Sequence, residues 1–526
     1  MRLLIKNIKL LPLLMIAVVI TSCGRTIEDS RVSSDSAANS IVEIDRNASM
    51  ITDGDAVPNI IIILADDLGW RDVGYNDSEI NTPNFDALAA AGVRLERFYV
   101  QPTCSPTRAA LMTGKSPLRL GITSPLSKNN PKGLPLSEKT LADHLGVIGY
   151  ETAIVGKWHL GGRNLAYHPN QRGFDSFYGH VTGGVGYFDK VHGGGYDWQR
   201  NGVTVRDEGY ATRLIANEAV SVLNSRDPTK PIFLYIAFGA PHLPNEAPEE
   251  SIEAYSHIEN KQRRIHAAMV SELDTAIGQI VSELGSLGLA ENTLIWFMSD
   301  NGGLIPNDQF QGLPRGATKT GIEAQFGVKT TPRFIDFVMT NALDGGSDNH
   351  PFQGGKGDVS EGGVRVPSFV TWPKVLAPRA DPHMATVQDV LPTLLEITGS
   401  DLEDPDEFDG RSIWSSLSAG VPSPPRDYIV QAFSGKQETA FFRFPYKLIA
   451  IEGQAPRLYN LSVDPLEDQN IAASQEQIVS DLQSAIDSFP RGVPVSIALQ
   501  AVVDDPDYFG GVEDRSPWAE AAYNEE

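Results

Sequence analysis

The stretch Cys104-Ser105-Pro106-Thr107-Arg108-Ala109-Ala110-Leu111-Met112-Thr113-Gly114-Lys115 organises the rest of the chain. It follows an apolar run over residues 93–100 that is typical of a strand, and Pro106 suits the first turn of a helix, where a missing N–H costs nothing. Cys104 would then lie at a helix N-terminus, where unpaired N–H groups and the helix dipole favour negative charge, with Arg108 one turn further along the same face. This cysteine is either a reactive nucleophile or, as lone cysteines usually are, a buried apolar side chain.

Four apolar runs elsewhere in the chain lead to polar side chains that are suited to chemistry. Runs of this kind are typical of parallel strands that are buried on both faces of a sheet. They cover residues 58–64, 151–155, 231–238 and 292–298, and they lead to Asp66 and Asp67, to Lys157 and His159, to His242, and to Asp300 and Asn301. Active sites of α/β sheets lie at the carboxyl ends of the strands. The pattern therefore predicts an α/β fold in which one site gathers these side chains.

The adjacent carboxylates of Asp66 and Asp67 are costly at the end of a buried strand unless a cation meets them. Their oxygens suit Ca²⁺ or Mg²⁺; alternatively, one aspartate caps a helix and the other faces water. Lys157 and His159 lie two residues apart, so both would face one side of an extended segment. The lysine supplies positive charge and the histidine can move a proton near neutral pH, although both residues could simply lie on the surface.

The rest of the chain can be divided by its hydrophobic periodicity and its composition. Its periodicity predicts helices over residues 83–92, 141–149, 211–225, 259–287, 384–398 and 476–489. It predicts a strand over residues 364–372. Residues 304–348 are rich in Gly, Pro, Asp and Asn and have the character of an insertion, and short antiparallel strands are expected over residues 427–451. We therefore expect a catalytic domain over residues 57–424 and a C-terminal subdomain with an acidic tail over residues 425–526.

The N-terminus predicts export. Arg2, Lys6 and Lys9 precede an apolar stretch that ends in Ile20-Thr21-Ser22-Cys23, which resembles a bacterial lipobox. This predicts a lipoprotein signal peptide over residues 1–22, lipidation of Cys23, a flexible tether over residues 23–56, and a membrane-anchored protein of the periplasm or cell envelope, with the outer membrane favoured. An ordinary signal peptide with a chance cysteine is the alternative. The net charge of −24 over 526 residues argues against nucleic acid as a partner.

Two of these motifs point to one family. Cys-x-Pro-x-Arg followed by Ala-Ala-Leu-Met-Thr-Gly resembles the signature of type I sulfatases, and Gly-Lys-x-His-x-Gly at residues 156–161 resembles their second signature. The resemblance covers roughly residues 57–490 and is closest to N-acetylgalactosamine-4-sulfatase-like members. It implies an alkaline-phosphatase-like α/β fold, in which a mixed sheet lies between helices and a small C-terminal α+β subdomain is built on a short antiparallel sheet.

The resemblance also implies a modified residue and a metal ion. A formylglycine-generating or anaerobic maturation enzyme would oxidise Cys104 to Cα-formylglycine, whose aldehyde forms a geminal diol in water. A Ca²⁺ ion would be held by the residues that match the family's ligands, namely Asp66, Asp67, Asp300, Asn301 and residue 104. With only two cysteines in the chain, lipidation of one and oxidation of the other would leave no disulfide.

The catalytic roles that the resemblance implies fall on six residues, Cys104, Arg108, Lys157, His159, His242 and Lys356. One hydroxyl of the diol would attack sulfur to form a covalent sulfo-enzyme, while His242 or Lys356 assists the departing alcohol. His159 would then take the proton of the second hydroxyl as sulfate leaves. Lys157, His242 and Lys356 would also bind the sulfate. Many relatives carry a sulfate-binding serine where this chain has Gly184, so either Thr182 substitutes or that contact is absent.

The expected substrate is a sulfated polysaccharide or oligosaccharide, with a galacto-configured 4-O-sulfate such as that of carrageenan or chondroitin/dermatan sulfate favoured by the resemblance. Residues 174–200 are rich in glycine and in aromatic residues, which sugar-binding sites often use. His350 lies six residues before Lys356, so His350 is expected to contact the sugar. Two alternatives remain open at this point. One is a phosphoester or phosphonate hydrolase on the same scaffold, and the other is a non-catalytic lipoprotein that binds sulfated glycans.

Overall fold

A computed structural model describes residues 57–127, 130–192, 195–305, 345–400, 407–423, 426–433 and 437–490. By its internal contacts the chain divides into two units, and every described residue belongs to the second, Met50–Glu526. The predicted signal peptide, Cys23 and the tether lie outside the described residues, as do most of the insertion and the acidic tail. Among the described residues no helix has both the length and the apolar character that a membrane crossing requires.

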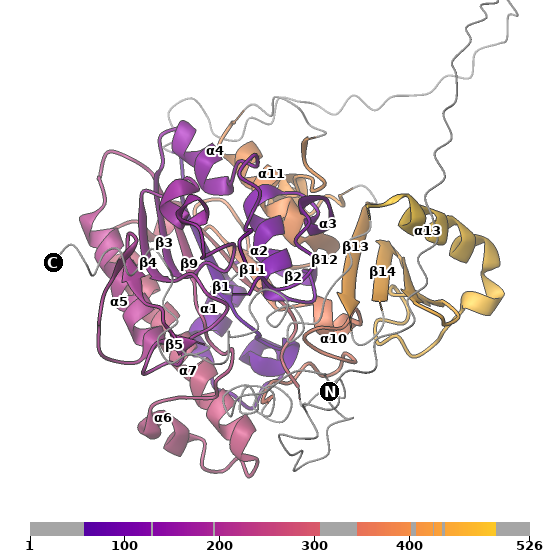
Figure 1. Ribbon diagram of the computed structural model, residues 1–526, viewed down its shortest axis with the longest axis horizontal. Coiled ribbons are helices and arrows are strands. Elements are labelled where there is room, and N and C mark those ends of the chain that lie inside the picture. Colours follow the sequence, from indigo (N-terminus) through magenta and orange to yellow (C-terminus); the bar gives the residue numbers. More distant parts are fainter. Residues whose placement is uncertain are drawn as a thin grey trace, which may run out of the picture. The chain divides into compact units, whose positions relative to one another are not determined.

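A mixed ten-stranded sheet forms the centre of the described part of the chain (Figure 1). Its strand order is β12-β2-β11-β10-β1-β9-β3-β4-β7-β8, and β10, β1, β9, β3 and β4 run parallel to one another. The strands span Asn59–Ala65 (β1), Val93–Tyr99 (β2), Glu151–Lys157 (β3), Ser176–His180 (β4), Gln199–Arg200 (β7), Val203–Thr204 (β8), Ile232–Ala237 (β9), Thr293–Ser299 (β10), Ser368–Thr371 (β11) and Arg379–Thr386 (β12).

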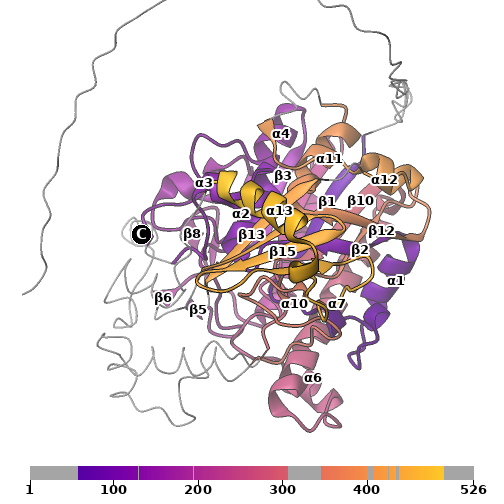
Figure 2. The ribbon, with the colours of Figure 1, turned by 90° about the vertical axis from the view of Figure 1, so that its right-hand side faces the viewer.

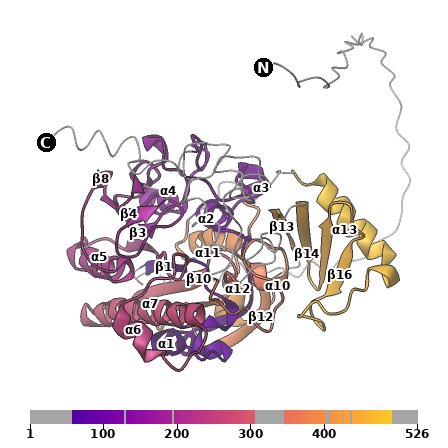
Figure 3. The same cartoon turned by 60° about the horizontal axis from the view of Figure 1, so that its bottom comes forward.

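Helices cover both faces of this sheet. In β1, Ile60 and Ile62 point into one hydrophobic cluster and Ile61 and Ile63 into another, which explains why the strand is an unbroken run of isoleucine. The first cluster includes residues of α2 (Cys104–Thr113), α4 (Leu141–Val147), α11 (Val390–Ile397) and α12 (Trp414–Ala419). The second includes residues of α1 (Pro83–Ala91), α5 (Ala211–Ser225) and α7 (Lys261–Ser286). Figure 3 shows α1 and α7 on the side of the sheet opposite α2 and α4.

Shorter elements complete this part. They are α3 (Pro117–Leu120), α6 (Glu249–Ala254), α10 (Glu361–Val364), the two-stranded ribbon of β5 (Val191–His192) and β6 (Gly195–Tyr196), and single 3₁₀ turns at Trp70–Asp72, Gly74–Asn76, Leu165–Tyr167, Pro169–Gln171, Ala290–Asn292 and Val387–Asp389. The turn Trp70–Asp72 follows β1 almost directly, and α10 follows the segment that carries Lys356. Several of these short elements therefore lie next to the predicted site.

The C-terminal part is a four-stranded antiparallel sheet in the order β13-β14-β15-β16. Its strands span Asp427–Phe433, Gln437–Arg443, Tyr446–Ile451 and Arg457–Asn460, and the 3₁₀ turn Ala472–Ser474 and α13 (Glu476–Ser488) follow them. Figure 2 shows α13 across one face of this sheet, where Leu482 and Ile486 are buried. The other face buries Tyr428 and Phe442 against Tyr99 of the main sheet. The predicted mixed sheet between helices, with a small antiparallel C-terminal sheet, is confirmed.

Two local predictions were wrong in part. The helix predicted over residues 384–398 begins only at Val390, because residues 384–386 extend β12 in parallel with β2. Asp389 ends that strand, since its carboxylate accepts hydrogen bonds from the backbone and hydroxyl of Thr386. The strand predicted over residues 364–372 covers only Ser368–Thr371, because Val364 closes α10. Strand pairing set the first of these boundaries, and the short helix α10 set the second.

Candidate active site

The two aspartate-containing pairs meet at the carboxyl edge of the main sheet. β1 and β10 pair in parallel with Ala65 opposite Ser299, so the residues after each strand emerge side by side. The backbone N–H of Asp67 donates to Asp300 Oδ1 over 3.3 Å, and Asn301 Nδ2 donates to Asp67 Oδ1 over 2.7 Å. All of these side chains are buried. The convergence that the strand ends predict is therefore present in the structure.

Three cations pair with the three carboxylates, and Arg108 also lies 3.7 Å from Asp66 Oδ2. The Arg108 guanidinium donates twice to Asp300 Oδ2, over 3.0 and 2.8 Å. Lys356 Nζ contacts both oxygens of Asp67, over 2.7 and 2.8 Å, and Lys157 Nζ donates to Asp66 Oδ2. Buried charges of this kind are tolerated only when they are paired. The site thus holds three buried carboxylates that are paired with three buried cations.

These contacts shift the ionisation of the paired groups. Burial by itself would raise the pKa of Asp67, but the neighbouring Lys356 ammonium outweighs it and holds that pKa below its ordinary range. Burial would lower the pKa of Lys356, but the Asp67 carboxylate raises it above its ordinary value, so Lys356 is protonated at neutral pH. Burial and repulsion from Asp66 raise the pKa of Asp300 to about 6.

Cys104 is the first residue of α2 and is buried beside these charges. Burial raises the pKa of its thiol in spite of the positive charges of Lys157 and Lys356, so the unmodified side chain is a neutral thiol at pH 7. Ser105, the next residue of α2, connects this helix to residues 156–161, because its Oγ donates a hydrogen bond to the His159 carbonyl over 2.9 Å. The position of Cys104 at a helix N-terminus suggested a thiolate with a low pKa, but this site raises the pKa of the thiol instead.

The two candidate histidines are held by backbone carbonyls. His159 adopts a left-handed backbone conformation with φ of 58°, and its Nε2 lies 2.9 Å from the carbonyl oxygen of Leu126. His242 follows β9, and its Nδ1 lies 2.6 Å from the carbonyl oxygen of Leu243. The other nitrogen of His242 lies 3.8 Å from Asp67 Oδ2. Burial and the charge of Lys356 lower the pKa of His242 to about 3, so this imidazole is neutral at physiological pH.

The donor set fits a hard divalent cation. Asp66 Oδ1 and Asn301 Oδ1 are buried and have no hydrogen-bond partner within the described ranges, which is costly unless something cationic meets them. Asp66, Asp67 and His242 offer one ligand atom each, all within 4.8 Å of one another. Asp300 is less free, because Arg108 occupies its Oδ2. Carboxylate and amide oxygens are the ligands that Ca²⁺ prefers.

Two predicted substrate contacts are not brought into this cluster. The Thr182 hydroxyl points to the carbonyl of Gly184 over 3.4 Å, and its backbone N–H donates to Asp197. His350 is exposed, and its ring forms no hydrogen bond or ion pair with any residue that the structure describes. A contact of either side chain with substrate stays a prediction. The other predicted residues, from Asp66 to Lys356, lie together.

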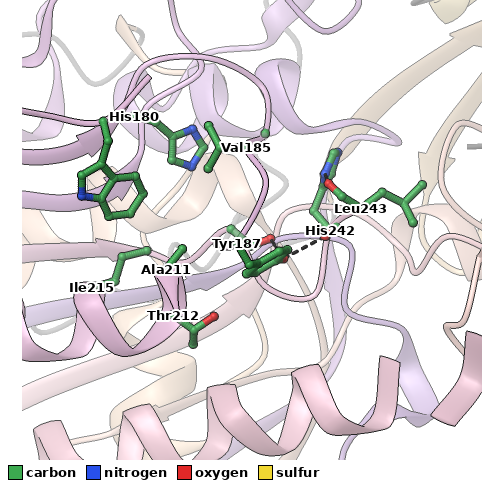
Figure 4. Close-up of a pocket in the computed structure, with 11 residues that line it drawn as sticks. His180, Val185, Tyr187, Ala211, Thr212, Ile215, His242 and Leu243 are labelled. Carbon is green, nitrogen blue, oxygen red and sulfur yellow. Dashed lines mark hydrogen bonds between the residues drawn. The ribbon is translucent and has the colours of Figure 1, made fainter. Parts of the chain in front are cut away.

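Several residues beside the site were not predicted. The Tyr187 hydroxyl lies 2.8 Å from the carbonyl oxygens of both Gly239 and His242, and it lines a small pocket behind His242 (Figure 4). Gly184, which had already been named from the sequence, lines the same pocket. Leu126, which was not predicted, supplies the carbonyl that holds His159. A carbonyl has no signature in a sequence, and the tyrosine is one of several aromatic residues in its segment. These contacts join residues about 30 to 60 positions apart.

Comparison with known proteins agrees with this geometry. The profile of the family named Sulfatase matches residues 58–400. Arylsulfatase J of Mus musculus is 36% identical over 398 residues, which cover 74% of this chain and 60% of that protein. Arylsulfatase A of Homo sapiens is 31% identical over 465 residues, which cover 79% of this chain and 83% of that protein. The matched region thus spans less than two thirds of arylsulfatase J and most of arylsulfatase A.

A similar protein has been solved with an oligosaccharide bound. The crystal structure of Ps i-CgsB in complex with k-i-k-neocarrahexaose superposes with a TM-score of 0.72 and 29% sequence identity. The match covers 86% of this chain and all of that one.

Proposed function

This chain belongs to the sulfatase family, with its alkaline-phosphatase-like fold, and on that premise we propose that it hydrolyses sulfate esters of a sulfated polysaccharide or oligosaccharide. The observation that carries the proposal is the buried cluster of Arg108, Lys157 and Lys356 around residue 104. A sulfate ester is anionic, and its transition state places more charge on the leaving oxygen. Fixed positive charge in a site closed to water stabilises that charge.

Residue 104 is proposed to act as Cα-formylglycine, made from Cys104 by a maturation enzyme. Its hydrated aldehyde would supply one hydroxyl to attack sulfur and a second whose deprotonation expels sulfate. The raised pKa of the unmodified thiol supports this, because a neutral, buried thiol is a poor nucleophile. Mass spectrometry of the peptide that contains residue 104 distinguishes a converted enzyme from a glycan-binding protein that keeps its cysteine.

The side chains around residue 104 divide the proton transfers between them. Lys356 is protonated and close to the site, so it is the proposed proton donor to the departing alcohol. His242 is neutral, and its Nδ1 faces the Leu243 carbonyl, so it is not the proposed proton donor; its ring is proposed to line the place where the sulfate group binds. His159 is the proposed base that receives the proton when sulfate leaves.

Asp66, Asp67, Asp300 and Asn301 are proposed to hold a divalent cation, most simply Ca²⁺, which would supply positive charge to the sulfate oxygens. Removal of calcium with a chelator should lower kcat/KM on an aryl sulfate by about a hundredfold or more, since such a cation contributes several kcal/mol. Re-addition of Ca²⁺ should restore activity. Elemental analysis that finds stoichiometric zinc, together with activity that survives calcium removal, would contradict this assignment.

The favoured substrate is a galacto-configured sugar with a 4-O-sulfate, as in carrageenan or chondroitin/dermatan sulfate. Similarity to a protein solved with neocarrahexaose supports the carrageenan class. A panel of defined sulfated oligosaccharides, read for released sulfate, tests the choice of sugar and carbon. Matched aryl sulfate, phosphate and phosphonate esters test the reaction class, and a preference for either phosphorus ester would replace the sulfatase proposal with a phosphoester or phosphonate hydrolase.

Substrate contacts beyond the sulfate are proposed to come from His350 and the segment 304–348. His350→Ala should lower kcat/KM on the natural glycan by about tenfold, the worth of one or two hydrogen bonds, and should leave an aryl sulfate almost unaffected. Lys132→Ala, an exposed residue of a different loop, is the matched surface control. Equal losses on both substrates would show that His350 is structural.

Location follows from the N-terminal residues alone and remains a proposal. We place the enzyme outside the cytoplasm, in the periplasm or on the outer membrane, anchored by a lipid on Cys23. The basic n-region, the apolar stretch and the lipobox-like end at Cys23 support this placement. A tether of this kind would present the site to a polymer or oligosaccharide that arrives from outside the cell.

A further inference from the structure

Two consecutive glycines pack directly against the two candidate histidines. A Cβ atom built on Gly183 would lie 2.7 Å from both Cε1 and Nε2 of His159, closer than real Cβ atoms approach other groups. A Cβ atom built on Gly184 would lie 3.0 Å from Nδ1 and 3.1 Å from Cε1 of His242. Residue 183 therefore lies next to the His159 ring, and residue 184 lies next to the His242 ring.

The loop that carries these glycines is anchored, so it cannot simply move aside. A single oxygen of Asp197 accepts the backbone N–H groups of Val181 and Thr182, over 3.1 and 2.8 Å. Asp197 is buried, and the Trp198 ring beside it packs against Tyr178 and His180 of β4. The two residues that precede Gly183 are thus held both by their connection to β4 and by Asp197.

Backbone carbonyls then determine where each imidazole carries its proton. A carbonyl oxygen only accepts hydrogen bonds, so the ring nitrogen that faces it must be the N–H. In neutral His159 the proton is therefore on Nε2, facing Leu126, and the lone pair is on Nδ1. In neutral His242 the proton is on Nδ1, facing Leu243, and the lone pair is on Nε2, toward Asp67. The two histidines are held as opposite tautomers.

We propose that Gly183 and Gly184 are positioning residues for this pair of histidines, a role that rests on the proposed sulfatase function. Gly183 leaves the His159 ring the room it needs, because a Cβ atom there would push the ring away; Nε2 therefore keeps its hydrogen bond to the Leu126 carbonyl and Nδ1 is the basic nitrogen. Gly184 leaves the His242 ring room to hold its hydrogen bond to Leu243, which keeps Nε2 facing the charged cluster. A Cβ atom at residue 183 would displace the His159 ring, whereas a Cβ atom at residue 184 would shift the His242 ring by a few tenths of an ångström.

The two glycines should consequently affect different halves of the reaction. With an aryl sulfate, Gly183→Ala should give a rapid burst of about one aryl alcohol per active site, followed by turnover that is about a hundredfold slower than in wild type, the cost of a misplacement of roughly 1 Å. Sulfated enzyme should accumulate and be visible by mass spectrometry. Gly184→Ala should slow the burst itself, because His242 contacts the sulfate before the alcohol leaves.

Gly285→Ala is the matched control, since Gly285 is exposed on α7 and a Cβ atom there meets nothing within 4 Å. It should leave the burst and turnover unchanged. If the wild type is active and Gly183→Ala turns over equally fast, this inference is overturned and the sulfatase proposal stands. Wild type that contains formylglycine and calcium yet releases no sulfate from any ester would overturn the sulfatase proposal instead.

The tautomers provide a readout that needs no variant of either glycine. Protein labelled with ¹⁵N-histidine distinguishes Nδ1–H from Nε2–H by NMR, and His159→Gln and His242→Gln assign the two resonances. We expect Nε2–H for His159 and Nδ1–H for His242 in the wild-type protein. The reverse tautomer at His159 would contradict the positioning role even if Gly183→Ala failed to fold.

Discussion

Purified Cys104→Ser protein should release sulfate at least about a thousandfold more slowly than the wild type, as expected when a nucleophile that acts as part of a unit is removed. A serine hydroxyl can attack sulfur once, but it lacks the second hydroxyl whose deprotonation expels sulfate. The variant should therefore stop as a sulfated serine, visible by mass spectrometry. Cys104→Ala should be equally inactive and should carry no adduct.

Both variants should fold, because residue 104 begins α2 and a small side chain is tolerated at a helix N-terminus. Circular dichroism and the melting temperature are the checks. The informative comparison is between the two variants, since only serine can be sulfated. Sulfate release at the wild-type rate by Cys104→Ser would rule out a mechanism that depends on the aldehyde hydrate.

Lys447→Met should lower the free energy of unfolding by about 3–5 kcal/mol, the usual cost of removing one partner from a buried ion pair. Lys447 Nζ lies 3.0 Å from Glu361 Oε1 and 2.8 Å from Glu467 Oε1, and all three side chains are buried. Glu361 also accepts the Tyr99 hydroxyl over 2.9 Å. Without the lysine, Glu467 loses its cation, and among the described residues Glu361 keeps only the Arg365 guanidinium, 3.5 Å away.

The same small sheet offers a matched control. Arg443 and Asp427 form an ion pair of 2.6 Å, but both side chains are 44% exposed, so Arg443→Met should cost less than about 1 kcal/mol. Urea unfolding of both variants measures the difference. Adding Glu361→Gln to Lys447→Met should recover part of the loss, because it removes the carboxylate that repels Glu467. Equal destabilisation by the two single variants would contradict the ion-pair explanation.

The loss in Lys447→Met should also depend on pH. Burial raises the pKa of Glu467 above its ordinary value of 4.5 even though Lys447 is beside it, and removal of the lysine should raise it further. A carboxyl group with a raised folded-state pKa favours folding below its ordinary pKa and loses that contribution as the pH rises through the folded-state value. Lys447→Met should therefore be least stable at neutral pH and should regain stability toward pH 4.5.

The sequence by itself determined the fold class and most of the candidate site. Unbroken apolar runs such as Ile60–Ile63 mark strands buried on both faces, and the polar residues that follow them must emerge at one edge of a parallel sheet. This is why Asp66, Asp67, Asp300 and Asn301 could be placed together from residues more than 230 positions apart. The polar residues that follow each apolar run thus predicted that these side chains share one site.

Only the tertiary structure decided the features that depend on contacts between distant segments. Met384–Thr386 form a strand rather than a helix because β2 pairs with them, and the C-terminal sheet is joined to α10 by a pair of residues 86 positions apart, Lys447 and Glu361. The close approach of Gly183 to His159, and the carbonyls that set each histidine's tautomer, leave no trace in residue type. A backbone carbonyl is the same in every residue, so its partner becomes known only when the chain is folded.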